Sequence, residues 1–125
     1  MIKKVLKIIA VVLLASACNI IFEEDLSKEV ILVNMPLDGT ISSDTSQLFW
    51  WELLDGALGY NLQIVAGSFD NPLYLLVDTN AIGNKFLFEM IPGEYQWRIS
   101  GWNNSSETKY GYHLLTITDS IINEE

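Results

Sequence analysis

The sequence predicts an all-β fold, a seven-stranded antiparallel β-sandwich that follows a cleaved N-terminal segment. Three observations support this fold class. From residue 29 onward, short runs rich in β-branched and aromatic residues alternate with turn residues at intervals of about ten. One run, residues 59–66, alternates apolar with mostly polar side chains, which is the period of a half-buried strand. No segment of this part shows a convincing helical pattern.

Each predicted strand is bounded by residues that favour turns. In order, the predicted strands are residues 30–33, 47–51, 59–66, 73–78, 85–89, 94–103 and 113–118. The first five turns between them are Pro36 with Asp38-Gly39, Asp55-Gly56, Asp70-Asn71-Pro72, Gly83-Asn84 and Pro92-Gly93. The last connection is the longer polar loop that begins at Trp102.

Aromatic residues at alternating positions predict the core. Phe49 and Trp51 fall on one face of their strand, and Tyr95 and Trp97 fall on one face of theirs. Two sheets can therefore bury these rings against each other without a disulfide. The predicted core residues are Phe49, Trp51, Tyr60, Tyr95 and Trp97.

Three ordered segments carry a family resemblance. They are Pro36 with Asp38-Gly39, then Phe49-Trp50-Trp51 leading to Gly59-Tyr60-Asn61-Leu62-Gln63-Ile64, and finally Ile91-Pro92-Gly93-Glu94-Tyr95-Gln96-Trp97-Arg98-Ile99 with Asn103 beyond. Together they resemble a fibronectin type III domain, an immunoglobulin-like sandwich, over residues 29–119. The resemblance implies that Tyr95 forms a tyrosine corner, in which the hydroxyl group bonds to a nearby backbone group.

The N-terminus is predicted to be a secretory signal peptide, residues 1–17. Lys3, Lys4 and Lys7 precede an apolar run, residues 8–17, that ends in small residues. This run is about half of the roughly 20 residues that a membrane-spanning helix needs. We therefore expect the segment to be cleaved.

The segment Leu14-Ala15-Ser16-Ala17-Cys18 resembles the lipobox of bacterial lipoproteins. The resemblance implies that Cys18 becomes the first residue and carries fatty acyl chains such as palmitate, which anchor the protein to a membrane. The alternative is an ordinary secreted protein with an unpaired cysteine. Residues 18–28 are predicted to be the lipidated cysteine and a short tether, and residues 120–125 a C-terminal tail.

The run Glu23-Glu24-Asp25 resembles the acidic signal that sends lipoproteins of the Bacteroidetes to the cell surface, with a solvated charge run as the alternative. The expected location is the outer membrane or the cell surface. Asp119-Ser120-Ile121 resembles an O-glycosylation sequence of exported proteins from the same bacteria.

Composition argues against several functions. The chain has 7 Lys and Arg against 16 Asp and Glu, a net charge of -9, which argues against a nucleic-acid partner. Cys18 and His113 are the only cysteine and histidine, so neither a disulfide framework nor a Cys/His zinc site can form. The sequence has no phosphate-binding loop or calcium loop. We expect no metal, no cofactor and no enzymatic activity.

A candidate binding face follows from strand alternation. Gln96, Arg98, Ser100 and Trp102 fall on the face away from the core, and the topology implied by the resemblance sets Asn61 and Gln63 beside them. Amides and an indole ring suit a sugar, although an ordinary solvated face with Trp102 shielded by the next loop is the alternative. The candidate binding loop contains Asn103, Asn104, Tyr110 and Tyr112.

The sequence thus predicts a non-enzymatic, membrane-anchored lipoprotein with one fibronectin type III-like module. Its expected ligand is a glycan or another protein of the cell envelope. The alternative is a structural accessory subunit of a larger envelope assembly with no ligand of its own.

Overall fold

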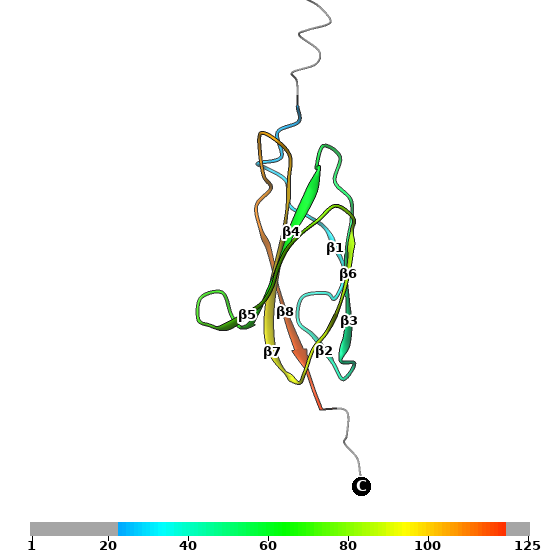
Figure 1. Ribbon diagram of the computed structural model, residues 1–125, viewed down its shortest axis with the longest axis vertical. Helices are drawn as coiled ribbons and strands as arrows, with labels where there is room; N and C mark the ends of the chain where they lie inside the picture. Colours follow the sequence, from blue (N-terminus) through cyan, green and yellow to red (C-terminus); the bar gives the residue numbers. More distant parts are fainter. Residues whose placement is uncertain (1–22, 120–125) are drawn as a thin grey trace, which may run out of the picture.

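The computed structural model describes residues 23–119, which form two β-sheets packed face to face (Figure 1). The predicted β-sandwich is confirmed, and residues 23–119 contain no helix. The predicted signal peptide (1–17), Cys18 and the tail (120–125) with Ser120 lie outside the described residues.

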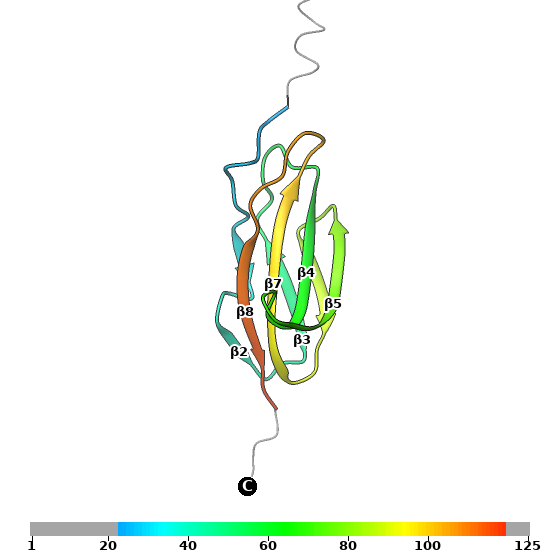
Figure 2. The same ribbon diagram turned by 90° about the vertical axis from the view of Figure 1, so that its left-hand side faces the viewer.

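One sheet has three strands in the order β1-β3-β6, and the other has five strands in the order β2-β8-β7-β4-β5, which face the viewer in Figure 2. The six strands of five or more residues match the predicted ranges within three residues at each end. The strands are β1 (Val33–Met35), β2 (Thr40–Ser42), β3 (Ser46–Trp51), β4 (Gly59–Gly67), β5 (Pro72–Ala81), β6 (Lys85–Glu89), β7 (Gly93–Trp102) and β8 (Gly111–Ile117).

The structure corrects the predicted strand count and orientation, because β2 is an eighth strand and pairs in parallel with β8. The turn that precedes β2 is hydrogen-bonded to β8. Gly39 N–H donates to the Leu114 carbonyl, and Leu114 N–H donates to Asp38 Oδ1. A strand of three residues is too short to show a two-residue period, so the sequence pattern could not reveal it.

The first predicted strand, residues 30–33, is also corrected. Regular pairing begins only at Val33, because the preceding residues cross from one sheet to the other. Val30 bridges to Lys109 beside the five-stranded sheet, whereas the Leu32 carbonyl accepts a hydrogen bond from Glu52 N–H. Ile31 lies between these points and is buried.

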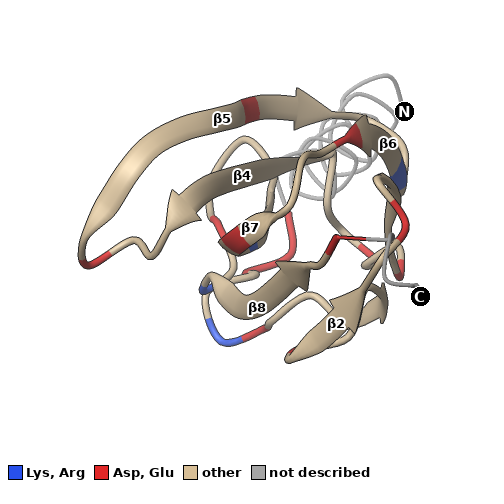
Figure 3. Cartoon of the chain, turned by 90° about the horizontal axis from the view of Figure 1, so that it is seen from below, with Lys and Arg blue, Asp and Glu red and all other residues tan. Residues whose placement is uncertain are grey.

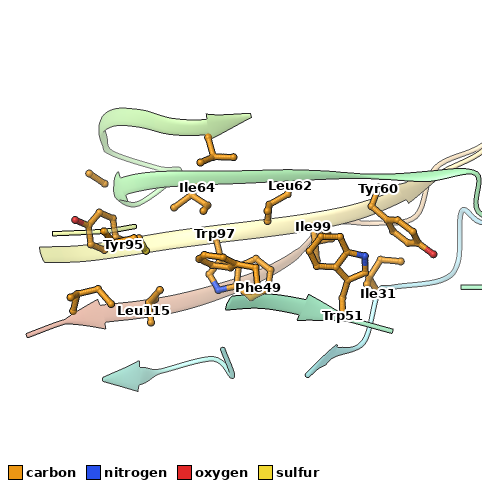
Figure 4. Packing of buried hydrophobic residues seen from close by; sticks show 14 residues of the cluster. Ile31, Phe49, Trp51, Tyr60, Leu62, Ile64, Tyr95, Trp97, Ile99 and Leu115 are labelled. Carbon is orange, nitrogen blue, oxygen red and sulfur yellow. The ribbon is translucent and has the colours of Figure 1, made fainter. Parts of the chain in front are cut away.

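The core lies between the sheets and contains the five aromatic residues that the sequence placed there (Figure 4). Phe49 and Trp97, from opposite sheets, meet edge to face with ring centroids 5.0 Å apart. The Tyr95 hydroxyl donates to the Ile91 carbonyl at 2.6 Å, which is the tyrosine-corner contact. This bond gives a buried hydroxyl its partner.

The described part of the predicted tether, residues 23–28, is a docked segment of the folded domain and not a free linker. Leu26 is only 1% exposed, and its N–H donates to Ser106 Oγ. The carbonyl of Glu24 accepts a hydrogen bond from Asn103 Nδ2 at 2.8 Å. Residues 23–28, which the sequence assigned to the tether, therefore belong to the folded domain, and Glu23 also accepts a hydrogen bond from Ser105 Oγ.

Candidate functional site

The candidate binding face lies on the outer side of the five-stranded sheet. Strands β4 and β7 are antiparallel neighbours, as the family resemblance implied, with Gln63 opposite Arg98 and Asn61 opposite Ser100. Because side chains at these positions alternate with core residues, they point away from the three-stranded sheet. The structure thus brings Asn61, Gln63, Gln96, Arg98 and Trp102 onto one face.

Arg98 is enclosed by aromatic rings of the same domain. Its guanidinium carbon lies 4.1 Å from the ring centroid of Phe69 and 4.4 Å from that of Tyr110. Its Nε donates to Gln63 Oε1 at 2.7 Å, and its Nη1 donates to the Tyr112 hydroxyl at 3.2 Å. These contacts leave little of the guanidinium group for a ligand.

The β4–β5 hairpin folds over the other end of the candidate face. Phe69 N–H donates to Gln96 Oε1 at 2.8 Å, and the Phe69 ring meets Tyr112 edge to face at 5.7 Å. Gln96 and Arg98 therefore lie in a closed half of the face, beneath the hairpin and the start of β8.

The open half of the face forms a hollow of about 550 Å³ between β4, β5, β7 and the loop after β7. The indole ring of Trp102 forms part of it and packs on the backbone of Gly59, where a Cβ atom would overlap the ring. The residues that line the hollow are Asn61, Gln63, Asp78, Asn80, Ser100, Trp102, Glu107 and Tyr110.

Internal hydrogen bonds hold the floor of the hollow in place. The Asn61 amide donates to Asp78 Oδ1 and to Asn80 Oδ1, both at 3.1 Å, and its oxygen accepts from the Tyr110 hydroxyl at 2.8 Å. The amide nitrogens of Gln63 and Asn80 have no hydrogen-bond acceptor among residues 23–119. These two donors are available to a ligand.

The candidate binding loop divides into structural and accessible parts. Asn103 is 8% exposed, and its Oδ1 accepts hydrogen bonds from the N–H groups of Ser105 and Ser106. Asn104 is exposed at the end of the sandwich. Tyr110 lines the hollow and also contacts Arg98, and the Tyr112 hydroxyl accepts a hydrogen bond from Arg98.

Four residues of this face did not appear in the sequence-based selection: Phe69, Asp78, Asn80 and Glu107. Asp78 and Asn80 lie on β5, an edge strand without a clear alternation of apolar and polar residues. They share a face with Asn61 because of the β4–β5 pairing register, which the sequence does not show. Phe69 had one possible signal, since it is the only aromatic residue in the polar turn between β4 and β5. Trp50 lies on the other sheet, beneath Lys85 Nζ at 5.2 Å.

His113 lies apart from this face, on the inner side of β8. Its ring is 4.7 Å from that of Trp97, and its Nε2 is buried with no hydrogen-bond partner among the described residues. Burial lowers the pKa of His113 below its ordinary 6.5, while the carboxylate of Asp38 acts in the opposite direction. Protonation thus disfavours the folded state.

Stability is expected to fall as the pH drops below about 6.5. Between the pKa of His113 in the folded protein and its pKa of about 6.5 in the unfolded chain, the unfolded chain binds more protons at His113 than the folded protein does. The stabilising contribution of the neutral imidazole is therefore complete above pH 6.5 and is lost as the pH falls toward the folded-state pKa. Urea midpoints measured from pH 8 to pH 5 test this expectation. His113→Phe keeps a ring against Trp97 and should show a shallower decline. An identical decline in both proteins would contradict the assignment.

Charge on the described surface is predominantly acidic (Figure 3). Among residues 23–119, no group of three or more His, Cys, Asp or Glu side chains is arranged to hold a metal ion. Within the same range, no helix could cross a membrane.

Comparisons with known proteins define the fold. No family model matches the chain, and no curated protein matches it. Among solved structures, the fibronectin type III domain of the human collagen alpha-1(XX) chain aligns with a TM-score of 0.56 and 8% identity, covering 74% of this chain and 89% of that one. A fibronectin type III domain derived from the human KIAA0970 protein aligns with a TM-score of 0.54 and 12% identity over 79% of each chain. The protein has the fibronectin type III fold.

Proposed function

We propose that this protein is a non-enzymatic binding module that is anchored to the cell envelope by a lipid and takes a neutral glycan in the hollow on its outer sheet face. The hollow carries the proposal, because it combines unpaired amide donors with carboxylates and aromatic rings in about 550 Å³. That volume lies within the usual range for small-ligand sites of roughly 300–1,000 Å³.

The chemistry of the lining favours a sugar. Each hydroxyl group of a sugar both donates and accepts, which suits the amides of Gln63 and Asn80 beside the carboxylates of Asp78 and Glu107. The rings of Trp102 and Tyr110 can cover the apolar C–H surface. The two carboxylates disfavour an acidic sugar, since the guanidinium group of Arg98 is already held by Phe69, Tyr110 and Gln63.

A titration with neutral and acidic oligosaccharides tests the ligand class. Neutral sugars are expected to shift the side-chain amide signals of Gln63 and Asn80, and acidic sugars are not. Glu107→Ala and Asn80→Ala remove exposed ligand contacts and should each weaken binding about tenfold, the value of one good hydrogen bond. Glu94→Ala, an exposed carboxylate of β7 outside the hollow, is the matched control. Equal weakening in the control, or no shift with any sugar, would contradict the proposal.

Lipid attachment at Cys18 would hold the module at the outer membrane or the cell surface. Support comes from the lipobox-like segment that ends at Cys18. Cys18→Ser is expected to move the protein from the detergent phase to the aqueous phase, or to leave it as an uncleaved precursor. The folded domain should be unaffected, because the described core lies between Leu26 and Ile117. A cleaved Cys18→Ser protein that stays in the membrane would rule out this anchor.

The alternative function, a structural accessory subunit, is favoured by one surface. At the start of β5, Leu73 is 74% exposed, and Tyr74 and Leu75 are more than half exposed. Alternation along the strand places Leu73 and Leu75 on one face, and exposed apolar side chains that lie side by side are typical of protein contacts. This alternative expects a constant set of co-purified partners that is lost with Leu73→Asp and retained with Leu53→Asp, at an exposed leucine of the loop after β3.

A further inference from the structure

Strand β6 is an open edge of the three-stranded sheet. It pairs with β3 on one side, and no strand among residues 23–119 lies against its other side. Its neighbour in the chain, β5, belongs to the opposite sheet (Figure 1). An open edge presents backbone donors and acceptors to another strand.

The ladder with β3 shows which backbone groups of β6 point outward. Trp51 N–H donates to the Asn84 carbonyl at 3.1 Å, and Met90 N–H donates to the Thr45 carbonyl at 2.7 Å. In an antiparallel ladder, residue pairs joined by backbone hydrogen bonds alternate with pairs that are not joined. Asn84 and Met90 belong to joined pairs, so the backbone N–H and C=O groups of Phe86 and Phe88 also bond to β3. The N–H and C=O groups of Lys85, Leu87 and Glu89 then face the open edge.

The sequence of β6 is complementary to itself in an antiparallel sense. It reads Lys-Phe-Leu-Phe-Glu, so a reversed copy sets Leu87 opposite Leu87. The same alignment sets Lys85 opposite Glu89 and Phe86 opposite Phe88. Every pair formed is therefore either apolar with apolar or positive with negative, which are the favourable cross-strand pairs.

The side chains of β6 leave apolar surface that such a copy would cover. Leu87 is 65% exposed on the outer face. Phe86 and Phe88 stack at 6.0 Å on the inner face but stay half-buried, because nothing in the described chain closes this side of the core. The β3–β6 ladder has no bulge, whereas the ladder of the other long edge strand, β5, has two. Bulges protect an edge from pairing, and the β3–β6 ladder has none.

We propose that two copies of this chain associate by antiparallel pairing of β6 with β6 about a two-fold axis at Leu87. The two three-stranded sheets would then form one continuous sheet of six strands. The charges of β6 favour a second copy as the partner, because two-fold symmetry forms the Lys85–Glu89 pair twice in this contact. The chain as a whole is strongly acidic, so two copies repel each other through the rest of their surfaces.

Cysteine cross-linking of the full chain tests the register. Leu87→Cys puts two thiols on the axis, where opposite Cα atoms lie about 5.5 Å apart, within the range of a disulfide. Mild oxidation is expected to give a covalent dimer above the level of the wild-type chain, whose only cysteine is Cys18. Lys85→Cys is the matched control, because its two copies would lie about 14 Å apart along the strands. Equal cross-linking at both positions, or none at Leu87→Cys, would overturn the proposal.

Charge reversal tests the pairing without a new covalent bond. In sedimentation experiments on the full chain in mild detergent, Lys85→Glu and Glu89→Lys are each expected to weaken the dimer about tenfold, because two-fold symmetry places each change in the contact twice. The double variant restores both pairs and should recover wild-type association. A double variant that stays as weak as the single variants would refute the Lys85–Glu89 contact, and a wild-type monomer at every concentration would refute the dimer.

Discussion

Replacing Trp97 with alanine is expected to lower the free energy of unfolding by about 3–5 kcal/mol. The Trp97 side chain is fully buried and packs between Phe49 of the opposite sheet and His113 of β8. Alanine would leave a cavity where two sheets meet. The free energy of unfolding of a domain of this size is about 5–10 kcal/mol, so the variant should be close to unfolding at room temperature. Urea denaturation measures the loss.

Two variants serve as controls for Trp97→Ala. Trp97→Phe keeps an aromatic ring and removes an indole N–H that has no hydrogen-bond partner among the described residues, so its loss should be less than half as large. Trp102→Ala should cost about 1–2 kcal/mol, since this ring is half-buried against Gly59. A loss below about 1 kcal/mol for Trp97→Ala would show that the strand register is wrong.

Asn103→Ala is expected to cost about 2–3 kcal/mol, the second-largest effect of a single change considered for this domain. Its Nδ2 donates to the carbonyls of Glu24 and Gly56, and its Oδ1 accepts from two backbone N–H groups of its own loop. Alanine would leave these backbone groups without their partner in a poorly exposed site. The N-terminal segment should then detach before the rest of the domain unfolds.

Urea denaturation and amide hydrogen exchange together test this role of Asn103. The Leu26 N–H, which donates to Ser106 Oγ in the same cluster, should lose protection in Asn103→Ala while the amides of β7 keep theirs. Asn103→Asp keeps the acceptor and loses both donor bonds, so an intermediate loss is expected. Asn104→Ala, at the exposed neighbouring position, should be nearly neutral. Equal losses at positions 103 and 104 would contradict the proposed role.

The alternation of side chains determined the inner and outer faces of this sandwich. Within one strand, the face of each residue follows from its position in the chain, because successive side chains point to opposite sides. This local rule placed Phe49, Trp51 and Trp97 in the core and Asn61 and Gln63 on the outer face. The turn residues likewise indicated where most strands end, since their backbone preferences are local.

Only the tertiary structure decided which part of the outer face is open and where the folded body begins. Phe69 closes over Gln96 through a contact between residues 27 positions apart, and Asn103 holds Glu24 across 79 positions. The parallel pairing of β2 with β8 is equally remote in sequence. Such contacts depend on how loops return to the sheet, and no period in the chain encodes that path. The sequence therefore determined the layers of the sandwich, and long-range packing decided which residues of its surface remain accessible.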